Sequence, residues 1–456
     1  MFWRIKTIHF IGIGGTGMSG IAEVLHNLKF NVQGSDLNKS VYTERLESIG
    51  IKVFYGHKAE HLENADLVVV STAIKEDNVE YKEAKKRGIP VIRRGEMLAE
   101  LMRMKYGIAI SGTHGKTTTT AMAASVFNEA GFDPTVIIGG IFQKLNSNAK
   151  LGNSRFLIAE ADESDKSHLN LSPVFAVITN IDIDHLDFYK DLNDIKETFK
   201  LFANKVPFFG SVILNADDEN CRDIIPGLKK RVVTYGFSKD ADYVIDSLKK
   251  EKGHYSFTVL ESGKSLGEFK IKVPGIFNVQ NACAVIALAR ELRVSARKIK
   301  AGLEAYTGTK RRCEVVGDNG KLKVITDYAH HPKEIKSTIE ALKDFYGTEK
   351  VLTVFQPHRY TRTKALFKEF VESFPENQNV VLLPVYPAGE KPIKGISSER
   401  LCQEIKKRGL NCKYADNKEL LFKLLKGEKE KYEIIVFLGA GIIDSYARQF
   451  GDLING

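Results

Sequence analysis

The sequence predicts an α/β protein of three domains, each built on a mostly parallel β-sheet. Three observations carry this prediction. Short apolar strands alternate with helix-forming segments along nearly all of the 456 residues. A glycine-rich turn links a strand to a helix twice, at residues 12–17 and at residues 112–115. Between residues 243 and 273 the pattern changes to short strands with glycine turns, which predicts a β-rich insert in the central domain.

The first segment, residues 1–105, is predicted to form a Rossmann-like domain. An apolar strand at residues 5–10 precedes the glycine turn, and a helix follows at residues 18–28. A second strand, at residues 30–33, ends near Asp36. This order is typical of a domain that places a diphosphate on a helix N-terminus and a ribose hydroxyl near an acidic side chain. It does not say which nucleotide is bound.

A further strand at residues 66–70 ends in small side chains, from Ser71 to Ala73. Ligands of open α/β sheets bind at the carboxyl ends of the strands. We therefore expect these residues to line the same crevice as the first glycine turn.

The second segment, residues 106–308, opens with a glycine turn that resembles a phosphate-binding loop. The match is imperfect, because two residues separate Gly112 from Gly115 where the general pattern has four. An ordinary glycine-rich turn is the alternative interpretation. Lys116 and Thr117 at the start of the next helix favour a nucleotide site, because the lysine can reach terminal phosphates and the hydroxyl can bind magnesium.

Carboxylates and a histidine follow two further strands of this segment. Glu160 comes directly after the strand at residues 156–159, and His185 follows the strand at residues 174–179. We predict both as magnesium ligands. The neighbouring Asp182 and Asp187 are better interpreted as polar loop residues that cap helices. An apolar helix is predicted at residues 282–292.

The third segment, residues 309–456, again repeats strand and helix. We predict strands at residues 322–326, 351–355, 380–383 and 433–438, with helices at residues 332–345 and 364–374. This predicts a second Rossmann-like α/β domain. Two strand ends carry dense polar clusters, at residues 327–332 and at residues 356–362. Both are placed at the edge where ligands of such sheets bind.

The composition bounds the class of protein. The net charge is +10, but the basic residues are spread along helices without interleaved aromatic residues, so we expect no nucleic acid as a partner. No apolar run approaches the ~18 residues of a membrane span, and we expect neither a signal peptide nor a membrane partner. The five cysteines are scattered without a CxxC pair, which fits a reducing cytoplasm.

Seven motifs together carry a resemblance to a known family. They are SGTHGKTTT, EADESD, NIDIDHLD, FNVQNA, KRR, DYAHHP and QPHRYTR, and they span all three segments in this order. The chain resembles the ATP-dependent Mur ligases of peptidoglycan assembly, which carry these motifs in the same order. GIGGTGMSGIA, GSD and DYAHHP are most similar to the members that join L-alanine to UDP-N-acetylmuramate. The nearest alternative within the family is the group that recycles tripeptide, whose first glycine loop carries a cysteine and a bulkier residue where this chain has Gly14-Gly15-Thr16.

The resemblance implies one domain for each substrate: residues 1–105 for the UDP-sugar, 106–308 for ATP and 309–456 for L-alanine. It implies ATP and Mg²⁺ as cofactors and a monomer or weak homodimer. The UDP-sugar would meet Gly14, Gly15, Thr16, Gly17, Ser35, Asp36, His57, Ser71, Ala73 and Asn78. ATP would meet Gly112, Thr113, His114, Gly115, Lys116, Thr117, Thr118, Asn278, Asn281, Arg312 and Asp327. Magnesium would be held by Thr117, Glu160 and His185. L-alanine and the reacting carboxylate would lie near His330, His358, Arg359 and Arg362. The catalytic residues would be Lys116, Arg312, His330, Arg359 and Arg362.

The sequence departs from the family pattern at three positions, with Cys313 where an aromatic residue is expected, Thr326 where aspartate is common and Ala329 where glycine is common. The ionic residues are all present. Two other functions remain as alternatives. A dehydrogenase would use the first glycine loop and leave the phosphate-binding loop unexplained. A nucleotide-driven switch or nucleic-acid motor would need a basic strip with stacking aromatic residues, which the sequence lacks.

Overall fold

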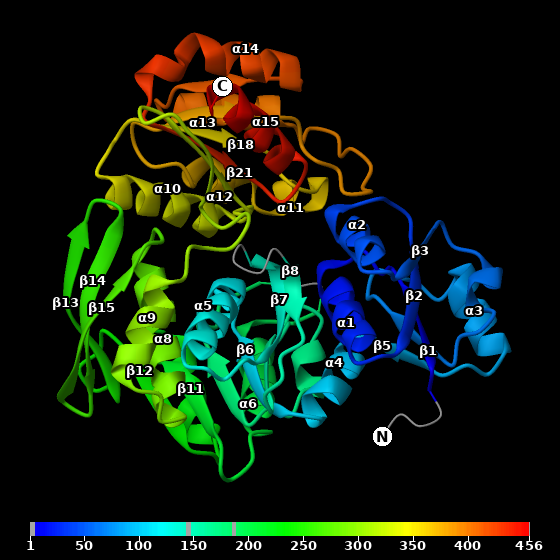
Figure 1. Ribbon diagram of the computed structural model, residues 1–456. Coiled ribbons are helices and arrows are strands. Elements are labelled where there is room, and N and C mark those ends of the chain that lie inside the picture. Colours follow the sequence, from blue (N-terminus) through cyan, green and yellow to red (C-terminus); the bar gives the residue numbers. More distant parts are fainter. Residues whose placement is uncertain (1–4, 143–146, 185–187, 456) are drawn as a thin grey trace. The chain divides into compact units, whose positions relative to one another are not determined.

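The computed structural model describes residues 5–142, 147–184 and 188–455 (Figure 1). The chain forms two compact units. The first comprises Met1–Leu248, Phe257–Ile271 and Phe277–Thr307, and the second comprises Lys249–Ser256, Lys272–Ile276 and Gly308–Gly456. Three separate, mostly parallel sheets confirm the predicted α/β class. In the described ranges, no helix combines the length and the apolar character that a transmembrane segment needs.

The N-terminal sheet has five parallel strands in the order β3-β2-β1-β4-β5. The strands are β1 (Thr7–Ile11), β2 (Asn31–Asp36), β3 (Lys52–Tyr55), β4 (Leu67–Val70) and β5 (Val91–Arg93). The helices are α1 (Thr16–Asn27), α2 (Val41–Ser48), η1 (Ala59–Leu62), α3 (Val79–Lys86) and α4 (Arg94–Arg103). The chain order places the first glycine turn directly after the central strand β1, at the carboxyl edge of this sheet.

The central sheet has ten strands in the order β15-β14-β13-β12-β11-β10-β6-β9-β7-β8. The strands are β6 (Tyr106–Ser111), β7 (Thr135–Phe142), β8 (Ser147–Lys150), β9 (Phe156–Glu160), β10 (Phe175–Ile178), β11 (Ser211–Asn215), β12 (Val232–Gly236), β13 (Tyr243–Glu251), β14 (His254–Glu261) and β15 (Lys264–Ile271). The run from β12 to β7 is parallel, and β8 is antiparallel to β7. The last three strands form the predicted β-rich insert.

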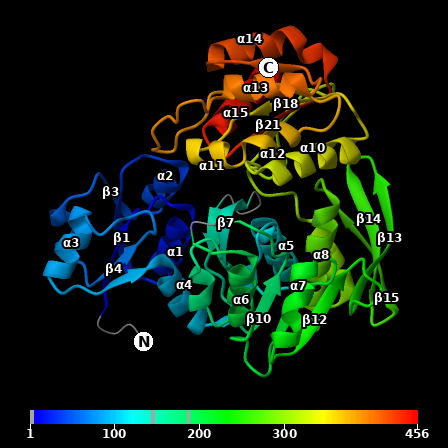
Figure 2. The ribbon, with the colours of Figure 1, turned by 180° about the vertical axis from the view of Figure 1, so that it is seen from behind.

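Helices cover both faces of the central sheet. They are α5 (Lys116–Glu129), η3 (Ser167–Asn170), α6 (Leu192–Ala203), α7 (Glu219–Ile224), η4 (Ile225–Gly227), α8 (Ile276–Glu291) and α9 (Ala296–Glu304). Helices α5 and α9 pack together and stand in front in Figure 1, whereas α6 and α7 stand in front in Figure 2. Phe199 and Phe202 of α6 share one buried cluster with Ala176 and Ile178 of β10, whose alternate residues face this side of the sheet.

The C-terminal sheet has six strands in the order β16-β17-β21-β18-β19-β20, and only β16 is antiparallel to its neighbour. The strands are β16 (Glu314–Asp318), β17 (Lys323–Asp327), β18 (Val351–Phe355), β19 (Asn379–Leu382), β20 (Cys412–Tyr414) and β21 (Ile434–Leu438). The helices are α10 (Pro332–Tyr346), α11 (Tyr360–Ala365), α12 (Phe367–Glu372), α13 (Ser398–Lys407), α14 (Lys418–Glu428), η5 (Lys429–Lys431) and α15 (Ile443–Asn455). Two buried clusters, one on each face of the sheet, make three layers.

The structure corrects two predicted helices. The helix predicted at residues 282–292 begins at Ile276, because Gly275, with φ of 98°, makes the turn directly before it. The FNVQNA motif therefore lies on a helix. The helix predicted at residues 364–374 is two short helices, α11 and α12, because the backbone of Leu366 departs from helical geometry. The last three residues of the QPHRYTR motif, from Tyr360 to Arg362, consequently start a helix, and the first four lie outside it.

Candidate active site

The phosphate-binding loop lies at the carboxyl end of β6, inside the central sheet. Gly112 has φ of 135° and Gly115 has φ of 84°, both in the left-handed region that favours glycine. A Cβ atom on Gly112 would lie 2.1 Å from Oγ1 of Thr179. The backbone N–H of His114 donates to Oδ1 of Asn180 at 2.9 Å. Helix α5 begins at Lys116 with no acidic residue in its first turn, so its positive end can attract an anion.

The ammonium group of Lys116 is held beside this loop. Its Nζ lies 2.8 Å from Oε1 of Glu163 and donates to the backbone oxygen of Gly112 at 2.7 Å. Burial lowers the pKa of Lys116, but Glu163, Asp162 and Glu160 outweigh that effect and the pKa is raised. Burial raises the pKa of Glu163 to about 7, against the opposing charge of Lys116. The lysine is therefore charged, and its partner titrates near neutral pH.

Thr117 and Glu160, two of the predicted magnesium ligands, lie together. Oγ1 of Thr117 is 3.0 and 3.1 Å from the two carboxylate oxygens of Glu160. The backbone N–H of Gly139 donates to the same carboxylate at 2.7 Å. A hydroxyl and a carboxylate are oxygen ligands of the kind that magnesium prefers. The third predicted ligand, His185, lies outside the described residues.

A magnesium ion here would need ligands besides the protein. Within the described ranges, no group of three or more His, Cys, Asp or Glu side chains could hold a metal ion. Magnesium characteristically keeps several waters and binds through one or two carboxylates plus substrate phosphates. The pair of Thr117 and Glu160 beside a phosphate-binding loop fits that mode.

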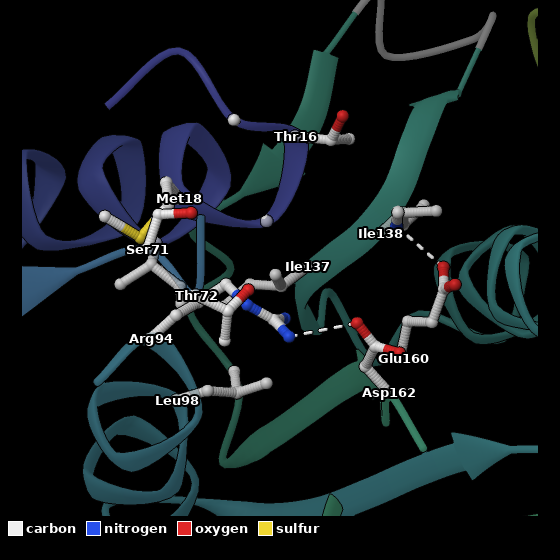
Figure 3. A pocket seen from close by; sticks show the side chains of 14 residues that line it. Thr16, Met18, Ser71, Thr72, Arg94, Leu98, Ile137, Ile138, Glu160 and Asp162 are labelled. Atoms are coloured by element: carbon white, nitrogen blue, oxygen red, sulfur yellow. Dashed lines mark hydrogen bonds and ion pairs between the residues drawn. The ribbon is translucent and has the colours of Figure 1, made fainter. Parts of the chain in front are cut away.

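A pocket of about 280 Å³ lies beside Glu160, between the first glycine turn and the central sheet (Figure 3). Two of the residues that line it form an ion pair, in which Nη2 of Arg94 lies 3.0 Å from Oδ2 of Asp162. Figure 3 shows these two side chains pointing toward each other. Arg94 was not predicted as a site residue, since nothing in the sequence of a helix start signals a partner 68 residues away. The pocket is lined by Gly15, Thr16, Gly17, Met18, Ile21, Ser71, Thr72, Arg94, Leu98, Ile137, Ile138, Gly139, Glu160 and Asp162.

The first glycine turn is shaped by Asp36. The backbone N–H of Gly14 donates to Oδ2 of Asp36 at 2.9 Å, and a Cβ atom on Gly14 would lie 2.9 Å from the same oxygen. The other oxygen of Asp36 accepts from the backbone of Asn38. Gly14 and Asp36, two of the residues predicted to contact the UDP-sugar, are thus brought together. Ser35 is fully buried and donates to Glu80 at 2.5 Å.

Four further candidates for the same site follow β3 and β4 along the chain. His57 follows β3 and Ser71 follows β4, so both stand at the carboxyl edge of the sheet. Ala73 donates its backbone N–H to Oγ of Ser71 at 3.4 Å. Asn78 accepts from the backbone of Glu80 at 2.9 Å and caps α3. The side chain of Asn78 therefore has a structural role as the N-cap of α3.

The two asparagines predicted near adenine lie beside the phosphate-binding loop. Nδ2 of Asn281 donates to Oδ1 of Asn278 at 3.0 Å, and both side chains are buried. A Cβ atom on Gly115 would lie 3.0 Å from Oδ1 of Asn281. The FNVQNA motif is thus brought against the loop from a distant part of the chain.

In the second unit, Asp327 ends β17 and is 7% exposed. Its two carboxylate oxygens accept from the backbone of Cys313 at 2.7 Å and of Ala329 at 2.8 Å. Burial raises its pKa, against the charge of Arg312. The guanidinium carbon of Arg312 lies 5.4 Å from the centre of the Tyr328 ring. Asp327 therefore fixes the backbone around the KRR and DYAHHP motifs.

Two histidines and two arginines gather at the ends of β17 and β18. The rings of His330 and His358 lie 6.2 Å apart, and Nη1 of Arg362 is 3.3 Å from Nδ1 of His358. Burial lowers the pKa of His330, and burial together with Arg362 lowers that of His358 to about 4. Arg359 has φ of 70°, an uncommon backbone conformation for a residue other than glycine. Both imidazoles are therefore neutral at pH 7 beside permanent positive charges.

Known proteins match nearly the whole chain. Family models match residues 7–106 (Mur ligase family, catalytic domain), 110–289 (Mur ligase middle domain) and 311–441 (Mur ligase, glutamate ligase domain). The chain belongs to the Mur ligase family. The order of these three matches is the order of the three sheets, so each sheet corresponds to one Mur ligase domain.

Individual Mur ligases are similar over nearly their full length. A UDP-N-acetylmuramate–L-alanine ligase of Sulfurihydrogenibium sp. is 49% identical over 96% of both chains. One from Trichlorobacter lovleyi is 51% identical over 97% of this chain and 98% of its own. The crystal structure of UDP-N-acetylmuramate-alanine ligase from Thermotoga maritima aligns with a TM-score of 0.85 at 30% identity, covering 98% of each chain.

Proposed function

We propose that this Mur ligase joins L-alanine to the lactyl carboxylate of UDP-N-acetylmuramate, with conversion of ATP to ADP and phosphate. The observation that carries the proposal is the end-to-end match, at about half identity, to relatives that bear this activity in their names. The product, UDP-N-acetylmuramoyl-L-alanine, is a peptidoglycan precursor. The dehydrogenase and motor alternatives are rejected, because neither belongs to this family.

The reaction needs ATP because a carboxylate is a poor electrophile. The substrate carboxylate attacks the γ-phosphorus of ATP and gives an acyl phosphate, from which the amine of L-alanine then displaces phosphate. Two anions must approach each other in the first step, so positive charge is the main requirement of the site. We propose that Lys116 and the N-terminus of α5 bind the terminal phosphates, and that Arg312 adds a charge from the second unit. The charged ammonium of Lys116, on a side chain that is 15% exposed, supports this role.

We further propose that Thr117 and Glu160 hold magnesium. When bound, the ion would neutralise negative charge on the phosphates. If these two side chains are ligands, Glu160→Ala should raise the magnesium concentration needed for half-maximal rate, whereas Glu100→Ala, on the surface of α4, should not. Titration of ADP release with magnesium measures this. If the magnesium dependence of the Glu160 variant were unchanged, Glu160 would not be a magnesium ligand and its role would be structural.

The amine of L-alanine must lose a proton before it reacts, and we propose that His330 accepts it. Nδ1 of His330 lies 3.0 Å from the backbone oxygen of Tyr328, which can only accept, so Nδ1 carries the proton of the neutral ring. Nε2 is then a lone-pair acceptor, and the lowered pKa keeps the ring neutral at pH 7. Arg359, Arg362 and His358 are proposed to bind the carboxylate of L-alanine beside it.

One assay tests the whole proposal. ADP release is measured with ATP, magnesium, UDP-N-acetylmuramate and each amino acid in turn. We expect turnover with L-alanine, and turnover must depend on both the sugar nucleotide and the amino acid. ADP release that ignored the sugar nucleotide would overturn the proposal. We also propose a cytoplasmic location and a monomer or weak homodimer; the five cysteines, all of them free thiols, support the location.

A further inference from the structure

A buried carboxylate lies beneath the proposed UDP-sugar site. Glu80, in the first turn of α3, is fully buried. It accepts from Oγ of Ser35 at 2.5 Å, from the backbone N–H of Lys58 at 3.1 Å and from the imidazoles of His61 at 2.6 Å and His9 at 3.2 Å. Burial raises the pKa of Glu80, but the hydrogen bonds from His9 and Ser35 outweigh it and hold the pKa at about 2. The carboxylate is therefore ionised and can only accept hydrogen bonds.

This fixed charge determines where the protons of its neighbours lie. Ser35 has one hydroxyl proton, and the 2.5 Å contact with Oε2 of Glu80 requires that proton. Oγ of Ser35 also lies 3.0 Å from Nδ1 of His57, so at this second contact the hydroxyl can only accept. Nδ1 of His57 is in addition 3.5 Å from Oε2 of Glu80, a second acceptor. The neutral ring of His57 therefore carries its proton on Nδ1 and a lone pair on Nε2.

The same reasoning gives His9 the opposite tautomer. Nε2 of Gln33 donates to Nδ1 of His9 at 3.3 Å, so the proton of His9 is on Nε2, where it is donated to Glu80. His9 is fully buried, whereas the side chain of His57 is 12% exposed. Of these two rings, only His57 therefore reaches the surface of the domain.

His57 stands where a ligand of this sheet is expected. It follows β3, which lies beside β2 (Figure 1), and β2 ends in Ser35 and Asp36. Asp36 is paired to Tyr55, and the backbone oxygen of Asp36 accepts from the backbone N–H of Gly56. The carboxyl ends of β3, β2 and β1 therefore meet at one edge, together with the first glycine turn. Nucleotides bind to parallel α/β sheets at this edge.

We propose that Glu80 and Ser35 are positioning residues that lock His57 in its Nδ1–H tautomer, so that Nε2 of His57 accepts a hydrogen bond from the imide N3–H of uracil. This inference rests on the proposed function, which supplies a uridine nucleotide as the substrate. Cytosine carries a lone pair on N3 where uracil carries a proton, and two lone pairs facing each other cannot form a hydrogen bond. The relay therefore selects uridine over cytidine nucleotides.

Calorimetric titration of the full chain with UDP and with CDP tests the selection. We expect UDP to bind at least ~10-fold more tightly than CDP, because a site built to accept one hydrogen bond rejects the analogue that lacks the donor. In Ser35→Ala and Glu80→Gln the affinity for UDP should fall ~5- to 10-fold, while the affinity for CDP should change by less than ~2-fold. The ratio of UDP affinity to CDP affinity should therefore approach one. His61→Gln is the matched control, because it keeps a donor to Glu80 outside the relay and should preserve the ratio.

A spectroscopic measurement separates this role from a merely structural one. The ¹⁵N NMR shifts of the His57 ring at pH 8 should show Nδ1–H in the wild-type chain and a mixture of tautomers in Ser35→Ala, which also serves if Glu80→Gln fails to fold. An Nε2–H ring in the wild type, or an unchanged UDP-to-CDP ratio in folded Ser35→Ala, overturns the relay. A chain that ligates L-alanine but binds UDP and CDP equally overturns the relay alone, whereas a chain that binds neither overturns the proposed function with it.

Discussion

At the scale of single residues, the ammonium group of Lys116 is held in the proposed ATP site by Glu163 and by the backbone oxygen of Gly112. Lys116→Ala should lower kcat at least ~10²-fold, by analogy with the loss of one preorganised transition-state donor. Binding of UDP-N-acetylmuramate should persist, because the first glycine turn belongs to another sheet. Lys150→Ala, which breaks the 2.6 Å pair with Asp133, is the control. ADP release and calorimetry measure the two effects, and near-native turnover of Lys116→Ala would contradict the ATP assignment.

A second residue-scale prediction concerns His168, which is fully buried between Phe199 and Phe202. Burial lowers its pKa from 6.5 to about 4. Because the unfolded chain binds the proton more readily, the contribution of His168 to stability is present above pH 6.5 and is lost as the pH falls toward 4. Phenylalanine has no group that titrates, so His168→Phe should remove this loss. As the pH falls from 6.5 to 4, the free energy of unfolding of the variant should rise relative to that of the wild type by up to ~3 kcal/mol.

Urea denaturation of the wild type and His168→Phe at a series of pH values between 7.5 and 4.5 tests this expectation. The informative quantity is the difference in the free energy of unfolding between the two chains, because the other groups that titrate in this range affect both chains equally. A difference that stays constant with pH would show that His168 does not titrate in the window.

The ionic side chains of the proposed ATP site were predictable from the sequence, but their partners were not. Lys116 and Glu160 were predicted from their places after strands, and the structure brings both to one edge of the central sheet. Glu163 and Arg94 were missed as interacting residues, because an ion pair depends on how side chains 47 or 68 residues apart are folded together. The run of acids in EADESD was the available signal for Glu163.

At the scale of elements, the link between β6 and α5 is the most constrained. Gly112→Ala would place a Cβ atom 2.1 Å from Thr179 at a φ of 135°, so the loop must move. Gly131 also has a positive φ, of 83°, but a Cβ atom in Gly131→Ala would meet nothing within 4 Å. We expect both variants to lose about 1 kcal/mol of stability from backbone strain, and Gly112→Ala to lose about 1–3 kcal/mol more from overlap.

The Gly112 and Gly131 variants should also differ in their affinity for ATP. Gly112→Ala should weaken ATP binding at least ~10-fold, because the loop that surrounds the phosphates is displaced. Gly131→Ala lies at the far end of α5 and should bind ATP normally. Thermal unfolding and ATP titration of both variants measure these effects, and equal ATP affinities would show that the loop does not contact the nucleotide.

Elements were predictable where the pattern is local. The strands at residues 351–355 and 433–438 were predicted nearly to the residue, because they are continuous apolar runs with clear ends. The start of α8 was placed six residues late, because the polar residues of FNVQNA look like a loop. They are helical, and Asn278 and Asn281 are buried against the phosphate-binding loop, a tertiary contact that the local sequence cannot show.

At the scale of the whole molecule, three sheets present polar side chains at the carboxyl ends of their strands. The first glycine turn follows β1, the phosphate-binding loop follows β6, and DYAHHP follows β17. Sequence alternation alone predicted this arrangement, because parallel strands that alternate with helices must all end at one edge. The proposal that one reaction uses residues from all three edges came from the family resemblance and not from periodicity.

This distribution leads to a prediction for Arg312, which belongs to the second unit, whereas Lys116 belongs to the first. If Arg312 adds charge to the phosphate only as it is transferred, Arg312→Ala should lower kcat ~10²- to 10³-fold while the affinities for ATP and UDP-N-acetylmuramate change by less than ~3-fold. Arg400→Ala, which removes an exposed arginine of the same unit, should leave all three values unchanged. Steady-state ADP release and calorimetric titration give the three values for each variant. A variant at Arg312 that lost ATP affinity and kept kcat would assign this arginine to ground-state binding instead, and a variant that kept all three would remove it from the site.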